Sequence, residues 1–154
     1  MRELAAVLGR ERVQLEFLLF KVLALQNLLR SGETRFLRWS VEEINRASER
    51  VRETELRRVQ RVGELATAAG VGTDEMTLST LAGTAPEPWR TIFADHDRGF
   101  RQLAVEVEDA FVTTCALADA SGHAIAGLLR TAYRPASPVP IGHQRQPVRT
   151  MILP

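Results

Sequence analysis

The sequence predicts an all-α protein: an antiparallel bundle or coiled coil of three long helices, with a short helical connector and an extended C-terminal tail. Long stretches of the 154-residue chain carry apolar residues at the alternating three- and four-residue spacing of a coiled coil. Segments containing glycine or proline separate these stretches. We therefore expect a helical domain over residues 1–133 and a tail over residues 134–154.

The first helix is expected over about residues 1–30. Its heptad positions are Leu4, Leu8, Glu11, Leu15, Leu18, Val22, Leu25 and Leu29. Glu11 is the polar interruption of this seam. Additional apolar residues lie beside the seam, namely Phe17, Leu19, Phe20, Leu23 and Leu28. The apolar face is therefore wider than a two-stranded seam requires, and we expect this helix to contact more than one neighbour.

A second helix is expected from about residue 33 or 34 to Ala69, after the turn at Ser31 and Gly32. Its seam begins with Leu37, Val41, Ile44, Ser48 and Val51. Continuing the same spacing would place Glu55 and Arg58 in the core. We therefore predict that the apolar stripe shifts, as in a coiled-coil stutter, and resumes through Leu56, Val59, Val62, Leu65 and Ala69.

Residues 70–87 are expected to connect the helices, with one or two helical turns over residues 77–82. A third long helix is then predicted from about Pro88 to Tyr133. Its seam is Phe93, His96, Phe100, Leu103, Val107, Ala110, Thr114, Leu117, Ser121, Ala124, Leu128 and Thr131. From Ala110 onward these side chains are mostly small, and Gly122 and Gly127 each disfavour a helix by roughly 1 kcal/mol. We expect the distal third of this helix to be weakly held, so that it frays or is completed by another molecule.

Catalysis is not predicted. Cys115 is the only cysteine, which allows neither an internal disulfide nor a thiolate metal cluster. His96 stands between two aspartates, but its seam position between Phe93 and Phe100 favours a packed histidine over a metal ligand or general base. The sequence contains no glycine-rich phosphate loop. We therefore expect no catalytic residues, no metal site and no cofactor.

Charge and hydropathy predict a cytoplasmic protein. The net charge of +1 gives no general reason to bind nucleic acid. No apolar run approaches the roughly 20 residues that a membrane span needs, and the N-terminus lacks the layout of a signal peptide. The tail holds five of the seven prolines together with several arginines. This composition predicts an extended segment rather than a strong nucleic-acid footprint.

Three segments resemble the FlgN family of flagellar export chaperones, especially its actinobacterial branch. They are Leu18-Leu19-Phe20-Lys21, then Gly32-Glu33-Thr34-Arg35-Phe36-Leu37, and finally Ala85-Pro86-Glu87-Pro88-Trp89-Arg90 with Phe93 and His96 following. The resemblance covers about residues 3–133, in order and with similar spacing. In other branches the last helix carries an Asn-Gly-x-Leu-Ile-like stretch. The equivalent here is Ser121-Gly122-His123-Ala124-Ile125, in which Gly122 and Ile125 match.

The resemblance implies a cytoplasmic chaperone for the two hook–filament junction proteins (hook-associated proteins) of the flagellum. Such a chaperone masks the amphipathic C-terminal helices of its clients, delivers them to the membrane export gate and needs no nucleotide of its own. A client helix would need apolar anchors at helical spacing. We therefore predict client contacts, with the tail closing over the client, at Leu117, Ile125, Leu128, Leu129 and Tyr133. Truncation after about Gly122 is then expected to abolish client binding.

Two other classes remain open. One is a generic coiled-coil adaptor or oligomeric structural subunit, whose seams are filled by self-association. The other is a helical protein that contacts nucleic acid through its arginine-rich end, which would show a steep salt dependence of binding. The sequence leaves open whether the working form is a monomer or a homodimer, and which client is preferred.

Overall fold

The computed structural model describes residues 1–132, which form helices and turns with no strand among them. The long helices are α1 (Arg2–Ser31), α2 (Leu37–Ala69) and α4 (Trp89–Ala120). Shorter helices are η1 (Thr34–Phe36), α3 (Leu78–Thr84) and α5 (Ile125–Ala132). The prediction of an all-α fold is confirmed for these residues. The expected boundary at residues 133 and 134, and the tail beyond it, lie outside the described residues.

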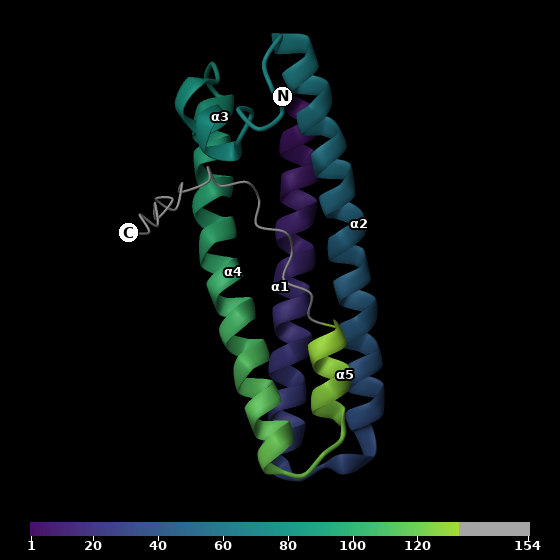
Figure 1. Ribbon diagram of the computed structural model, residues 1–154. Coiled ribbons are helices and arrows are strands. Elements are labelled where there is room, and N and C mark those ends of the chain that lie inside the picture. Colours follow the sequence, from purple (N-terminus) through teal and green to yellow (C-terminus); the bar gives the residue numbers. More distant parts are fainter. Residues whose placement is uncertain (133–154) are drawn as a thin grey trace, which may run out of the picture.

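Helix α1 is the centre of the arrangement. It packs along both α2 and α4, whereas α2 and α4 do not approach each other closely within residues 1–132. In Figure 1, α1 and α4 run in one direction, and α2 and α5 run in the opposite direction. Helix α5 contacts both α2 and α4, so it bridges the two outer helices at one end of the molecule. No helix of the described residues is long and apolar enough to cross a membrane.

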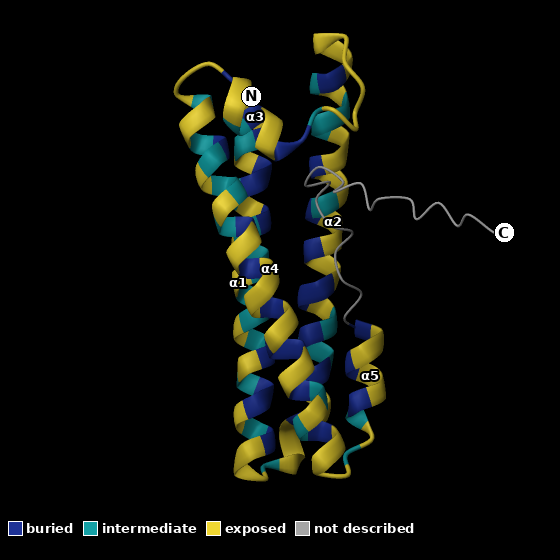
Figure 2. Ribbon diagram, turned by 60° about the vertical axis from the view of Figure 1, so that its left-hand side comes forward, coloured by how far each residue is buried: buried dark blue, intermediate teal, exposed yellow. Residues whose placement is uncertain are grey.

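Two apolar cores lie along the bundle, one near each end. The α3 core gathers side chains from α1, α3 and α4, including Leu4, Leu8, Leu81 and Phe93. The α5 core gathers side chains from α1, α2, α4 and α5. Figure 2 marks the buried positions that line the inside of the bundle. Each of the short helices α3 and α5 thus covers one end of a layer made by the long helices.

The third helix differs from its prediction, because α4 ends at Ala120 and the chain then reverses into α5. Gly122 adopts a left-handed conformation with φ of 68°, and its N–H donates to the carbonyl of Asp119. The predicted seam beyond Leu117 is exposed, namely Ser121, Ala124, Leu128 and Thr131. The reversal instead buries Ala126, Leu129 and Ala132. If α4 had continued straight, these residues would have extended beyond the end of α1, where no other helix could pack against them.

Substitution of Gly122 by alanine tests this turn. We expect the variant to lose about 1–2 kcal/mol of folding free energy, because a side chain at this positive φ is strained. The matched control is Gly127→Ala in α5, where an added Cβ meets nothing within 4 Å. That control should gain about 1 kcal/mol from helix propensity. Urea unfolding of both variants gives the two values, and equal effects would contradict the proposed turn geometry.

The predicted stutter in α2 is wrong. The buried stripe continues through Thr54 and Arg58, whereas Leu56 is 71% exposed and Val59 is 55% exposed. The heptad spacing is therefore maintained at the cost of placing a charged residue in the core. The partner of Arg58 in α1, described below, explains how this charge is accommodated.

Candidate partner-binding groove

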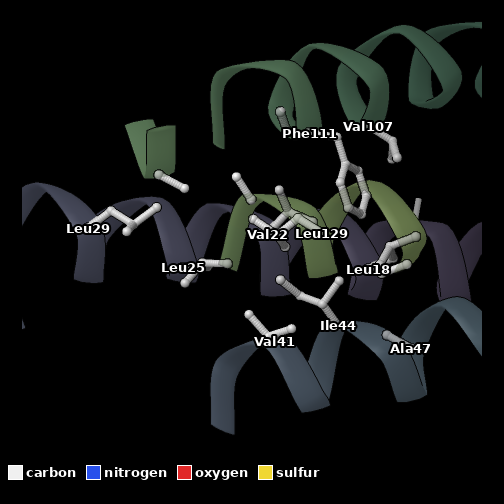
Figure 3. Packing of buried hydrophobic residues seen from close by; sticks show 14 of the residues in the cluster. Leu18, Val22, Leu25, Leu29, Val41, Ile44, Ala47, Val107, Phe111 and Leu129 are labelled. Carbon is white, nitrogen blue, oxygen red and sulfur yellow. The ribbon is translucent and has the colours of Figure 1, made fainter. Parts of the chain in front are cut away.

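The groove between α2 and α4, with α1 as its floor, is the principal candidate for a binding site; we call it the α5 groove. Val22 of α1 and Ile44 of α2 have no exposed surface, and Phe111 of α4 is 1% exposed. Figure 3 shows these side chains converging on Leu129 of α5, which is itself fully buried. The chain thus seats one of its own amphipathic helices between the outer helices.

The position of α5 is held by few interactions. Its buried residues are Ala126, Leu129 and Ala132, of which only the leucine is large. Burying one leucine contributes roughly 1.5–3 kcal/mol. The guanidinium of Arg52 donates to the carbonyl of Ala132 at 3.1 Å, and Arg130 forms an exposed ion pair with Asp119. An isolated helix of this length is marginal in water, so α5 depends on its docking to remain helical.

The predicted client-contact residues have different positions. Leu117 of α4 and Ile125 of α5 are partly buried against the α5 core, and Leu129 lies within it. Leu128 is 57% exposed and lines a shallow groove between α2 and α5. Tyr133 lies outside the described residues. The structure therefore brings Leu117, Ile125 and Leu129 to the same core, while Leu128 points away from it.

Small and polar residues let α4 approach α1 closely beside this groove. The amide of Gln26 in α1 donates to the backbone carbonyl of Ala110 at 2.9 Å, and the Thr114 hydroxyl donates to the same carbonyl at 2.6 Å. The bond from Gln26 joins the two helices and fixes the level of α4 relative to α1, whereas the bond from Thr114 lies within α4. Cys115 is partly buried nearby, and burial raises the pKa of its thiol. The thiol is therefore protonated near neutral pH, which suits a packing role rather than a nucleophile.

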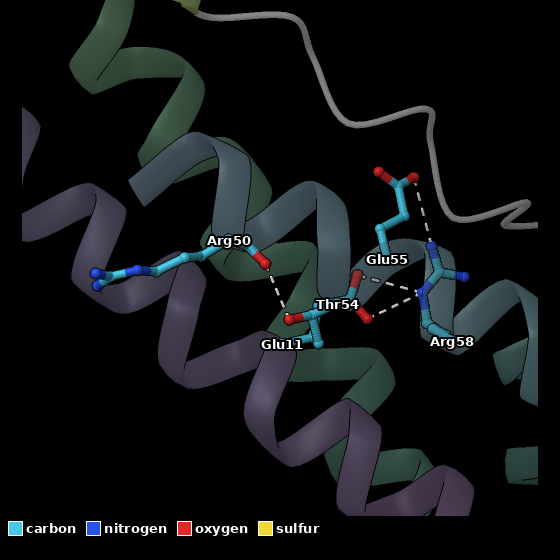
Figure 4. A network of polar contacts seen from close by, with 5 residues as sticks. All are labelled: Glu11, Arg50, Thr54, Glu55 and Arg58. Atoms are coloured by element: carbon cyan, nitrogen blue, oxygen red, sulfur yellow. Dashed lines mark hydrogen bonds and ion pairs between the residues drawn. The ribbon is translucent and has the colours of Figure 1, made fainter. Parts of the chain in front are cut away.

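A buried ion pair that the sequence interpretation missed lies farther along the bundle, toward α3. The Nε of Arg58 donates to both carboxylate oxygens of Glu11, at 3.2 Å and 3.0 Å (Figure 4). Glu55 lies 3.6 Å from the same guanidinium. Burial raises the pKa of Glu11, and the charge and hydrogen bonds of Arg58 oppose that rise. The two polar interruptions of the α1 and α2 seams therefore satisfy each other.

His96 packs between α4 and α1 as expected for a bundle histidine. Its ring centroid lies 6.3 Å from that of Phe100, and its Nδ1 is buried without a hydrogen-bond partner among the described residues. Desolvation lowers the pKa of His96, and the nearby charge of Arg12 adds to the effect. No group of residues within positions 1–132 is arranged to hold a metal ion.

The lowered pKa of His96 predicts a pH dependence of stability. The folded chain binds the histidine proton less readily than the unfolded chain. The free energy of unfolding should therefore decrease as the pH drops below the ordinary histidine pKa of about 6.5. The loss should continue until the folded-state pKa is passed. Urea unfolding between about pH 7 and pH 5.5 measures it. His96→Gln should flatten the profile over this interval, and an unchanged slope would contradict the assignment.

Comparisons with family models, with curated proteins and with solved structures found no match to the chain. The resemblance to the FlgN family therefore stays a prediction from the sequence.

Proposed function

We propose that this protein binds an amphipathic helix of a partner protein in the α5 groove, in the position that α5 occupies. The observation that carries the proposal is the seating of α5 itself between α2 and α4. A groove that holds a short amphipathic helix through one leucine and two alanines has the shape and apolar lining that a longer helix needs. A partner helix with larger anchors would bury more apolar surface there than α5 does.

The resemblance to the FlgN family supplies the identity of the partner in this proposal. The chain would act in the cytoplasm as a flagellar type III export chaperone. Its clients would be the C-terminal amphipathic helices of the hook–filament junction proteins, which it delivers to the export gate. Binding would cover the apolar face of the client helix and prevent aggregation before export. This role uses shape and burial alone, so it requires no catalytic group.

Two substitutions on adjacent residues of α5 test whether a partner helix replaces α5. Leu129→Asp places a charge in the α5 core and should release α5, because an unpaired carboxylate is costly to bury. Affinity for a synthetic C-terminal helix of a junction protein should then rise about tenfold or more, since competition is removed. Leu128→Asp changes an exposed position by the same chemistry and should leave affinity within about twofold. Fluorescence anisotropy with the labelled peptide measures both.

Truncation after Gly122 distinguishes two models. In one, α5 competes with the client for the α5 groove, and in the other, α5 itself contacts the client. If α5 competes with the client, the truncated chain should bind the peptide more tightly than the full chain. If Ile125, Leu128 and Leu129 contact the client, as the sequence predicts, the same truncation and Leu129→Asp should both weaken binding. Circular dichroism confirms that the long helices persist in each variant. Absence of binding by the full chain and by both variants would reject the proposed function.

A further inference from the structure

Two polar contacts join α5 to the walls of the α5 groove. The guanidinium of Arg52 in α2 donates to the backbone carbonyl of Ala132, the last residue of α5, at 3.1 Å. Asp119, which lies beside the turn that precedes α5, pairs with the side chain of Arg130. A helix that takes the place of α5 therefore meets a cation where α5 ends and an anion near where α5 begins.

Arg52 is placed to bind the C-terminal end of a helix. The carbonyls of the last helical turn have no N–H partner within the helix, and together they carry a partial negative charge. In a helix that continued past Ala132, this carbonyl would accept from the backbone N–H four residues later. Instead it accepts from Arg52. The other N–H groups of Arg52 form no hydrogen bond or ion pair with residues 1–132.

The buried stripe of α2 becomes polar just beyond Arg52. It runs from Val51, which belongs to the α5 core, through Thr54 to Arg58. Arg58 pairs with Glu11 of α1, so the inside of the bundle carries charge there rather than apolar surface. A bound helix that continued past Arg52 would leave the apolar lining of the α5 groove. The groove therefore fits a helix that ends where α5 ends.

The two charges of the groove also favour one direction of the bound helix. Helix α5 runs parallel to α2, from the end near Asp119 toward Arg52 (Figure 1). In the opposite direction, the negative end of the helix would lie near Asp119 and its positive end near Arg52, and both contacts would be unfavourable. Glu49 of α2 also lines the groove beside Ala132, but it is exposed, so water weakens its repulsion of an anion.

We propose that the partner helix ends within the α5 groove and that Arg52 binds its C-terminal carboxylate. This inference rests on the proposed function, because it names the end of the partner that occupies the groove. A guanidinium can donate two parallel N–H groups to a carboxylate, and such charge-assisted bonds are stronger than a bond to a neutral carbonyl. Helix α5 is followed by residues 133–154, so it offers Arg52 only the neutral carbonyl. The carboxylate therefore favours the partner over α5.

Two forms of one labelled peptide test the role of the carboxylate. The peptide is the C-terminal helix of a junction protein, made with a free carboxylate or with a C-terminal amide. The full 154-residue chain should bind the free carboxylate form about fivefold to tenfold more tightly, as measured by fluorescence anisotropy. Arg52→Gln should reduce this ratio of affinities to about one, because it removes the charged donor. Arg52 is exposed, so folding should be preserved, as checked by circular dichroism.

The ratio of the two affinities is compared because Arg52→Gln also removes a contact of α5. Loosening α5 changes the affinity for both peptide forms equally. Any difference in helicity between the two free peptides is likewise the same for every variant of the chain. Arg57→Gln is the matched control, since Arg57 is exposed on the same helix but lies roughly 140° around α2 from Arg52. This control should leave the ratio unchanged.

The possible failures are distinguishable. Equal affinities of the unaltered chain for the two forms, or a ratio that survives Arg52→Gln, would overturn this inference and leave the proposed function intact. A ratio that rises in Asp119→Asn but does not respond to Arg52→Gln would show that the partner helix runs in the opposite direction, which also overturns it. Absence of binding of either form, by the full chain and by Leu129→Asp, would reject the proposed function and this inference with it.

Discussion

Replacing Arg58 by leucine is expected to cost about 3–5 kcal/mol of folding free energy, because it leaves a buried carboxylate without its partner. Both Arg58 and Glu11 are almost completely buried, with 6% and 4% of their side chains exposed. Without Arg58 the carboxylate of Glu11 has no cation in the core, and burial already raises its pKa. The chain must then either bury an unpaired charge or protonate it. Guanidinium unfolding at neutral pH measures the loss.

The double variant Glu11→Leu/Arg58→Leu is the control for this prediction. It removes both charges and fills the space with apolar side chains, so its stability should equal or exceed that of the unaltered chain. The single variant should also lose less stability at acidic pH, where Glu11 can accept a proton. A single variant as stable as the double variant would show that the pair is not desolvated as the structure indicates.

Phe111→Ala is expected to cost about 3–5 kcal/mol, the usual range for deleting a buried aromatic ring. Phe111 is 1% exposed and belongs to the core on which α5 is seated. The cavity would lie beneath α5, so amide hydrogen exchange in α5 should accelerate more than exchange in α3, which packs on the other core. Urea unfolding combined with hydrogen exchange checks both parts.

Val112→Ala is the matched control for Phe111→Ala. Val112 follows Phe111 in α4 but is 64% exposed, so its truncation should change stability by about 0.5 kcal/mol or less. The two variants therefore differ in burial far more than in position. Similar losses for both would mean that α4 is rotated about its axis relative to the structure.

The periodicity of the sequence was sufficient to predict the helices but not where α4 ends. The heptad spacing continues numerically through Ser121 and Leu128 whether or not a neighbouring helix exists at that level. Because α1 ends at Ser31, a longer α4 would have had no partner for those positions. Gly122 is unfavourable inside a helix. Its left-handed conformation, however, also requires a surface on which the reversed chain can pack, and the periodicity of the sequence does not show that surface.

The pairing of Glu11 with Arg58 could have been predicted from the sequence. Each residue interrupts the seam of its own helix, and the two stand at nearly equal distances along the chain from the turn at residues 32–36. Antiparallel helices joined by a short turn place such residues opposite each other. Considering each interruption alone led to the wrong stripe through Leu56 and Val59, which are exposed.

For the candidate site, the small residues from Ala110 onward indicated the region in which the structure places the α5 groove. They did not indicate the occupant. Leu117, Ile125 and Leu129 do gather at one core, but the core is closed by α5 itself. Single-chain periodicity describes which faces are apolar, and it does not say whether an apolar face is buried within the same chain or by a partner.

The order of helices along the chain affects the protein while it is being synthesised. The ribosome releases α1, α2 and α4 before α5, and the two outer helices do not contact each other within the described residues. A chain that has emerged from the ribosome as far as Ala120 therefore exposes the α5 groove, which Leu129 later fills. Such transiently exposed apolar surface makes an unfinished chain prone to aggregation. A delay between the folding of α4 and the docking of α5 would prolong this stage, and rapid docking would shorten it.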